Sequence, residues 1–264
     1  MIERRPVGIF DSGVGGLTVL KEIEKILPSE DLIYFGDNLR APYGSRDSKE
    51  VAEFCLRIGK FLEEIGSKLL VIACNTATIA ALKELQEKLS IPVIGVINPG
   101  AREALKVTKN NKVGVLSTPL TAKLNAYRDE IKKINESVEV HQVGCKPIVQ
   151  MIESGWEDTP ENQAIIKYYV DKLPKDTDVV VFGCTHFPII KEHFIKELKG
   201  KEIVDPAKET ALEVKKILKE LDLLNKGEKN GKVSFYTSGS ISKFKKLAEK
   251  ILGRPIETIK QALN

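Results

Sequence analysis

The sequence predicts an α/β protein made of two similar lobes, each a mainly parallel sheet flanked by helices. Short apolar runs alternate with amphipathic stretches along nearly the whole chain, which is typical of repeated strand–helix units. The apolar runs are rich in Val and Ile and alternate little, as expected of strands buried on both faces. Three short segments also recur in the same order roughly 110 residues later, so we expect an approximate twofold between the lobes, with the active site in the cleft between them.

The predicted elements follow one another in regular order. Each predicted helix has apolar residues three and four positions apart, with Lys and Glu on the opposite face. The predicted strands cover residues 7–10, 32–35, 69–73, 93–96, 113–116, 138–140, 179–182, 203–204 and 233–235. The clearest helical patterns cover residues 49–65, 77–88, 123–133, 189–198, 209–224 and 242–251.

The internal repeat sets the expected domain boundaries. Residues 7–12, 71–76 and 96–99 are echoed by residues 113–118, 181–186 and 203–206. Because the second copy ends near residue 206, we expect the rest of the chain to return to the first lobe. The first lobe would then contain residues 1–97 and 207–264, and the second lobe residues 98–206.

Composition excludes several classes of protein. The chain has 264 residues, of which 42% are hydrophobic and 30% charged, as in ordinary globular proteins. The net charge of +4 is too small to predict a nucleic-acid partner. No apolar run approaches the ~18 residues of a membrane span, and the first residues lack the apolar core of a secretory signal. We therefore expect a soluble, cytoplasmic protein.

The four cysteines are widely spaced and form no C-x-x-C pair. Neither a zinc site nor a disulfide framework is therefore expected. Cys55 lies inside a helical pattern, and Cys145 has no equivalent in the other lobe. We interpret both as packing residues.

Ligands of open parallel sheets bind beyond the carboxyl ends of the strands. The first strand ends in a glycine-rich turn, residues 11–16, where the glycines allow a close backbone approach and the helix start offers amide donors to an anion. Thr18 stands where a dinucleotide-binding fingerprint needs its third glycine, so the turn does not favour a dinucleotide site. A plain strand–helix turn capped by Asp11 remains an alternative. The loop 37–46 could close on a small polar molecule through Tyr43 and the Gly44 amide.

The strongest signals are residues 74–76 and 183–186, Cys-Asn-Thr and Gly-Cys-Thr-His. Each cysteine ends an apolar strand immediately before a helix, where the helix amides are expected to lower the pKa of the thiol. Because the two segments are echoes, we expect one thiol from each lobe to face the other across the cleft. Such a pair could remove a proton from one face of a carbon and return one to the other. The two sulfurs should then lie roughly 6–7 Å apart, with each about 3–3.5 Å from the carbon.

The motifs at these positions resemble the glutamate racemases, the cofactor-independent branch of the aspartate/glutamate racemase family. The resemblance rests on residues 10–19, 41–44, 73–77 and 183–188 in this order. It implies interconversion of L- and D-glutamate without pyridoxal phosphate, metal or another cofactor, and supply of D-glutamate for peptidoglycan. It also implies a homodimer. The N-terminal extension through which some members are activated by a cell-wall precursor is not expected here.

The resemblance also assigns roles to residues. Cys74 would deprotonate D-glutamate and Cys184 L-glutamate, assisted by Asp11 and His186 and by a third acid, Glu153. From the residues alone, His186 could equally act from the opposite wall of the cleft or be an ordinary cap residue, and His141 and His193 are interpreted as structural. The substrate's carboxylates and ammonium group would be held by Asp11, Ser12, Pro42, Tyr43, Gly44, Asn75, Thr76, Thr118, Thr185 and His186.

Three other functions remain open at this level. One is a racemase for aspartate or a related acid, because pocket volume alone separates it from glutamate. Another is a cysteine hydrolase or amidase with Cys184 as nucleophile and His186 as base, which leaves the echoed Cys74 unexplained. The last is a two-lobed binding protein for a small acid in which the cysteines merely pack.

Overall fold

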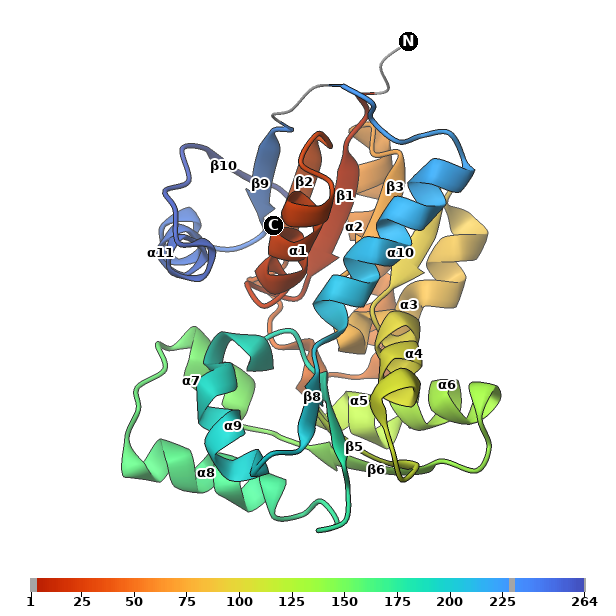
Figure 1. Ribbon diagram of the computed structural model, residues 1–264. Coiled ribbons are helices and arrows are strands. Elements are labelled where there is room, and N and C mark those ends of the chain that lie inside the picture. Colours follow the sequence, from red (N-terminus) through yellow and green to blue (C-terminus); the bar gives the residue numbers. More distant parts are fainter. Residues whose placement is uncertain (1–3, 228–230, 264) are drawn as a thin grey trace.

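The protein contains two parallel sheets that lie one above the other in Figure 1. The computed structural model describes residues 4–227 and 231–263. The first sheet has the strand order β10-β9-β2-β1-β3-β4 and the second the order β6-β5-β7-β8. All strand pairs within them are parallel. The α/β class and the parallel sheets predicted from the sequence are thus confirmed.

The strands of both sheets are short. Those of the first sheet are β1 (Val7–Asp11), β2 (Leu32–Gly36), β3 (Leu69–Ile72), β4 (Val93–Gly95), β9 (Val233–Thr237) and β10 (Ile259–Gln261). Those of the second are β5 (Lys112–Ser117), β6 (Glu139–Gly144), β7 (Val179–Gly183) and β8 (Glu202–Val204). The edge strand β10 was not predicted, because its three residues are largely exposed and form no apolar run.

Helices cover both faces of each sheet. They are α1 (Leu17–Ile26), α2 (Ser48–Glu64), α3 (Asn75–Lys88), α4 (Ile97–Val107), α5 (Pro119–Lys123), α6 (Ala126–Ile134), α7 (Ile148–Glu153), α8 (Pro160–Val170), α9 (Lys191–Leu198), α10 (Pro206–Glu220) and α11 (Ile241–Leu252). Two short 3-10 turns, η1 (Tyr43–Ser45) and η2 (Phe187–Ile190), complete the set. The single helix predicted over 123–133 is wrong: α5 and α6 are separate, because Asn125 between them has φ +54°, a left-handed conformation that interrupts a helix.

The internal repeat corresponds to a repeated topology. Strands β2-β1-β3-β4 of the first sheet stand in the same order as β6-β5-β7-β8 of the second. The echoed segments fall on β1 and β5, on the ends of β3 and β7, and on the starts of α4 and α10.

Helices α4 and α10 cross between the two sheets. Helix α4 follows β4 of the first sheet, yet its Ile97, Ala101 and Ala104 pack in the core beneath β5 and β7 of the second. Helix α10 follows β8 of the second sheet but packs against α1 and the first sheet, over which it lies in Figure 1. This exchange favours lobe boundaries after residues 97 and 206, which stay a prediction.

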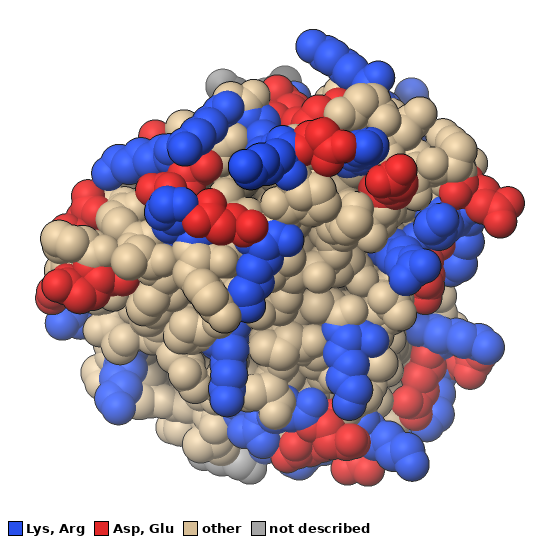
Figure 2. All heavy atoms as spheres, turned by 90° about the horizontal axis from the view of Figure 1, so that it is seen from below, with Lys and Arg blue, Asp and Glu red and all other residues tan. Residues whose placement is uncertain are grey.

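The surface carries mixed charge. On the face shown in Figure 2, Lys and Arg side chains alternate with Asp and Glu around uncharged areas. Within residues 4–227 and 231–263, no helix combines the length and the apolar character needed to cross a membrane.

A buried ion pair anchors the segment that leads from α10 to β9. Lys68 Nζ lies 2.6 Å from Glu30 Oε2, and the two side chains are 0% and 1% exposed. The same Nζ donates to the Leu223 carbonyl at 2.8 Å, and Glu30 Oε1 accepts the Asn225 N–H at 2.6 Å. The pair therefore holds the returning chain against the first sheet.

Removing one partner of this pair should destabilise the protein strongly, because the other charge stays buried without compensation. We predict that Lys68→Met lowers the free energy of unfolding by about 3–5 kcal/mol, measured by urea denaturation. The matched control is Lys83→Met, since Lys83 pairs with Glu87 at 3.9 Å and is 91% exposed. That change should cost no more than about 0.5 kcal/mol. Equal losses in the two variants would contradict the prediction.

Candidate active site

The predicted site residues gather where the carboxyl ends of the two sheets meet. Asp11 ends β1, and Cys74 follows β3 as the N-cap of α3. Thr118 and Cys184 follow the equivalent strands of the second sheet, β5 and β7. Both thiols line one cavity, so the prediction that each half of the chain contributes one sulfur to a common site agrees with the geometry.

This cavity is small. Its volume is about 10 Å³, close to the minimum that holds one water molecule. Any larger ligand therefore requires its walls to separate. Asp11 and Glu153 were predicted as site residues but lie behind the cavity wall, where they contact the lining side chains. Val149 and Gly183 line the cavity and were not predicted. The other lining residues were all predicted: Ser12, Pro42, Tyr43, Gly44, Cys74, Asn75, Thr76, Thr118, Cys184, Thr185 and His186.

Cys74 is held as a neutral thiol. Its Sγ accepts the Ala77 N–H at 3.5 Å and donates to Ser12 Oγ at 3.8 Å. Burial, reinforced by the charge of Asp11, raises the pKa of Cys74 to about 12, although the Ala77 amide and Ser12 act in the opposite direction. The expectation of a lowered pKa was therefore wrong for Cys74: the helix amide contributes as predicted, but desolvation and the nearby carboxylate outweigh it.

Cys184 has different neighbours. Its Sγ lies 3.9 Å from Nδ1 of His186. A helix was predicted immediately after Cys184, but the four-residue turn η2 starts only at Phe187 and is followed by α9. Because residues 184–186 are not helical, side chains two positions apart can meet. His186 therefore lies on the same wall as Cys184 and not on the opposite one.

His186 links Cys184 to Glu153. Its Nε2 lies 2.9 Å from Glu153 Oε1, at the end of α7. Burial alone would lower the pKa of His186, but the hydrogen bonds and charges of Cys184 and Glu153 together raise it well above its usual value. The contacts with Cys184 and Glu153 therefore favour the charged form of the His186 ring.

Asp11 joins the two walls. It is fully buried and accepts the Gly13 N–H and the Thr185 hydroxyl, each at 3.0 Å. Burial raises the pKa of Asp11, against the effect of the charge on His186 and of these hydrogen bonds. A carboxyl group of this kind can hold or share a proton inside the site.

The glycine-rich turn has a steric role. A Cβ at Gly15 would lie 2.5 Å from both His186 Nδ1 and Thr185 Oγ1, and one at Gly13 would lie 2.3 Å from Glu153 Oε1. The glycines therefore leave room for side chains from the opposite wall of the cavity. The prediction from the sequence was different, namely that the turn lets the backbone come close to an anion.

A cluster of hydroxyl groups closes the other side of the cavity. The Oγ1 atoms of Thr76, Thr118 and Thr121 lie 2.8–3.0 Å from one another, and Tyr127 donates to Asn75 Oδ1 at 2.7 Å. Thr121 and Tyr127 were not predicted. Their contact with the site depends on how α5 and α6 pack against α3, which no sequence motif indicates. These bonds connect α3 of the first sheet to helices of the second.

The remaining cysteines and histidines lie elsewhere. Cys55 and Cys145 are buried in hydrophobic clusters on the two sheets. His141 is half-exposed on β6, and His193 packs on the Trp156 ring. Among the described residues, no group of three or more His, Cys, Asp and Glu side chains could hold a metal ion.

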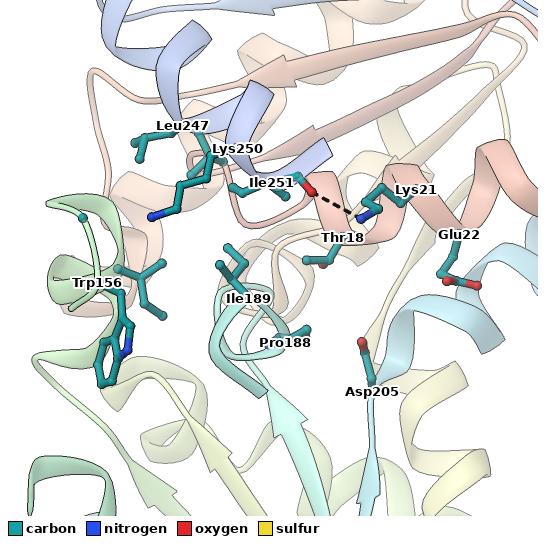
Figure 3. Close-up of a pocket in the computed structure, with 13 residues that line it drawn as sticks. Thr18, Lys21, Glu22, Trp156, Pro188, Ile189, Asp205, Leu247, Lys250 and Ile251 are labelled. Atoms are coloured by element: carbon teal, nitrogen blue, oxygen red, sulfur yellow. Dashed lines mark hydrogen bonds between the residues drawn. The ribbon is translucent and has the colours of Figure 1, made fainter. Parts of the chain in front are cut away.

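A larger open groove of about 380 Å³ lies nearby, between α1, α11 and η2. Figure 3 shows Lys21, Lys250 and Trp156 at its walls. Neither thiol lines it. We assign the chemistry to the small cavity because both thiols and His186 line it, and because Asp11 and Glu153 are hydrogen-bonded to its lining side chains.

Comparison with known proteins places the chain among racemases. Residues 8–214 match the Asp/Glu/Hydantoin racemase family. A protein of Fusobacterium nucleatum named glutamate racemase is 42% identical over 252 residues, which is 95% of each chain. The crystal structure of a glutamate racemase isoform from Bacillus anthracis matches with a TM-score of 0.94 and 41% identity, over 98% of both chains. That of the Francisella tularensis glutamate racemase in complex with D-glutamate matches with a TM-score of 0.91 and 35% identity, over 100% of this chain and 98% of that one.

The raised pKa of Cys74 makes stability depend on pH. The folded chain keeps this proton up to about pH 12, whereas an unfolded thiol loses it near pH 8.5. The contribution is therefore fully present below about pH 8.5 and is lost as the pH rises towards 12. We predict that the free energy of unfolding of the wild type falls by about 1–2 kcal/mol relative to that of Cys74→Ser between pH 8 and pH 10.

Denaturant unfolding at several pH values measures this difference. Cys55 and Cys145 are present in both proteins, so their own titration cancels. A difference that stays constant between pH 8 and pH 10 would show that Cys74 ionises equally in the folded and unfolded chains.

Proposed function

The chain belongs to the Asp/Glu/hydantoin racemase family, and from that premise we propose that it interconverts L- and D-glutamate with two thiols. The observation that carries this proposal is the pair of cysteines, one after β3 and one after β7, that line a single cavity. A hydrolase needs one nucleophile and leaves Cys74 without a purpose. A binding protein needs neither the thiols nor a histidine beside one of them.

We assign the removal of the α-proton of L-glutamate to Cys184 and the return of a proton to Cys74. Cys184 lies 3.9 Å from His186, whose pKa is raised well above its usual value, and burial raises the pKa of Cys74 to about 12. The base and the acid of the proposed reaction then line one cavity. Glu153 keeps the His186 ring oriented through Nε2, and Asp11 favours the protonated form of Cys74.

The reaction then needs two proton transfers. The Cys184 thiolate takes the α-proton of L-glutamate, and the electron pair of the C–H bond stays on the α-carbon. The Cys74 thiol gives its proton to the opposite face of that carbon, which yields D-glutamate. Cys184 is left as a thiol and Cys74 as a thiolate, which is the form that reacts with D-glutamate. As predicted from the sequence, this mechanism requires the two sulfurs to lie roughly 6–7 Å apart, one on each side of the α-carbon.

Donors around the cavity would orient the substrate. Thr76, Thr118, Asn75 and Ser12 line the cavity with hydroxyl and amide groups. Glutamate carries two carboxylates, so several hydrogen-bond donors are what its recognition requires. The walls must separate to admit it, because a volume of about 10 Å³ is close to the minimum for one water.

The wider role follows from the product. D-glutamate is a building block of bacterial peptidoglycan, so we propose that the protein supplies it for cell-wall synthesis in the cytoplasm. We also propose that it acts as a homodimer. None of the steps above uses pyridoxal phosphate or a metal.

Replacing one thiol at a time should separate proton removal from racemisation. In heavy water, Cys74→Ser should still exchange the α-hydrogen of L-glutamate through Cys184, and Cys184→Ser should exchange only that of D-glutamate. Both variants should lose racemisation by about 10²-fold or more, because the second proton transfer lacks its group. Proton NMR measures the exchange, and chiral chromatography measures the racemisation.

The same experiment distinguishes the other functions. A hydrolase should keep its activity in Cys74→Ser, and a binding protein should leave the α-hydrogen in place even in the wild type. Exchange of both enantiomers by a single-cysteine variant would refute the two-thiol division of labour. Parallel assays with aspartate test the alternative substrate.

A further inference from the structure

Asp37 is a buried acid that lies behind the cavity wall. It follows β2, and its side chain is fully buried. Its Oδ1 accepts from Arg40 Nη1 at 2.8 Å and from the Ser238 hydroxyl at 2.5 Å. Its Oδ2 accepts from the Tyr43 hydroxyl at 2.5 Å. Asp37 itself does not line the cavity, so any role in the reaction passes through these partners.

The loop that Asp37 holds forms one wall of the cavity. Pro42, Tyr43 and Gly44 line it, and the Tyr43 ring packs on Phe54 with a centroid distance of 6.0 Å. A Cβ at Gly44 would lie 2.4 Å from Thr118, so this loop rests directly on the second sheet's side of the site. The Tyr43 hydroxyl is bonded to Asp37, so this hydrogen bond fixes the position of a residue that lines the cavity.

The same acid connects the loop to the end of the chain. Ser238 follows β9, and Arg40 Nη2 donates to the Leu263 carbonyl at 2.9 Å. Arg46 Nε in turn donates to the Arg40 carbonyl at 2.6 Å. The segment 238–263, which contributes no residue to the cavity lining, is thereby tied to the wall that contacts the ligand.

We infer that Asp37 is a positioning residue, which holds the wall formed by residues 42–44 where the substrate binds and couples it to the C-terminal segment. This inference rests on the proposed glutamate racemisation. We expect Asp37 to affect substrate binding and not the proton transfers, because none of its hydrogen bonds described above involves a thiol.

The donor count explains why an acid stands here. Arg40, Ser238 and Tyr43 all donate, and an ionised carboxylate accepts on both of its oxygens. An asparagine whose oxygen stays with Arg40 and Ser238 turns its amide group towards Tyr43. The Tyr43 hydroxyl can then no longer donate to residue 37, so Asp37→Asn breaks this hydrogen bond in its present direction and takes the acceptor from a buried O–H, which is costly.

The test compares Asp37→Asn, Tyr43→Phe and the double variant in racemisation assays from both enantiomers. We expect Asp37→Asn to raise KM for both enantiomers about tenfold while kcat changes less than about threefold. Tyr43→Phe should raise KM about threefold, and adding it to Asp37→Asn should have no further effect, because both changes break the same bond. The matched control is Asp47→Asn in the same loop, an exposed helix cap that should leave KM unchanged.

Several outcomes would overturn the inference. An unchanged KM in Asp37→Asn does so, as does a loss confined to kcat, or KM effects of the two single variants that multiply in the double variant. If thermal melting shows that Asp37→Asn does not fold, Tyr43→Phe decides, and an unchanged KM there refutes the role. A wild type that does not racemise glutamate refutes the proposed function itself, whereas an active wild type with normal variants refutes only this inference.

Discussion

The ionisable side chains around the cavity between the sheets are almost fully buried, and this burial governs their pKa values. An isolated ion is costly to bury, so ionisable groups there either pair or stay neutral. The pKa of His186 is raised because Cys184 and Glu153 both contact its ring. The pKa of Cys74 is raised to about 12 by burial and by the charges of Asp11 and Cys184, against the effect of Ser12 and a helix amide. The proposed division of roles between the thiols therefore rests on their different neighbours.

The fold creates this cavity by placing two like sheets end to end. Parallel strands present all their carboxyl ends at one edge, and two such edges facing each other enclose a site from both sides. The exchange of α4 and α10 binds the halves together, because each helix packs in the core opposite to the strand that precedes it.

Much of this arrangement could be predicted from the sequence, and the failures have physical causes. Strand ends were visible because polar residues follow apolar runs, and the echo of residues 71–76 in 181–186 pointed to two facing thiols. The net pKa of Cys74 could not be predicted, since it depends on burial and on Asp11, more than sixty positions away. Asp37 and Thr121 were missed for a similar reason. Their partners come from other segments, and neither residue stands in an echoed motif.

The two halves share a topology, but the side chains around their thiols differ. This difference is compatible with a reaction that interconverts mirror images. Enantiomers have equal free energies, so the equilibrium constant is one and kcat/KM must be equal in both directions whatever the enzyme's own asymmetry. A proton that rests on Cys74 therefore cannot bias the equilibrium. In the proposed mechanism it decides which enantiomer the resting form accepts, and the other enantiomer must meet the form in which Cys184 holds the proton. Exact symmetry of the two halves is thus unnecessary. What the proposed two-thiol reaction needs is one proton fewer than the two sulfurs could hold.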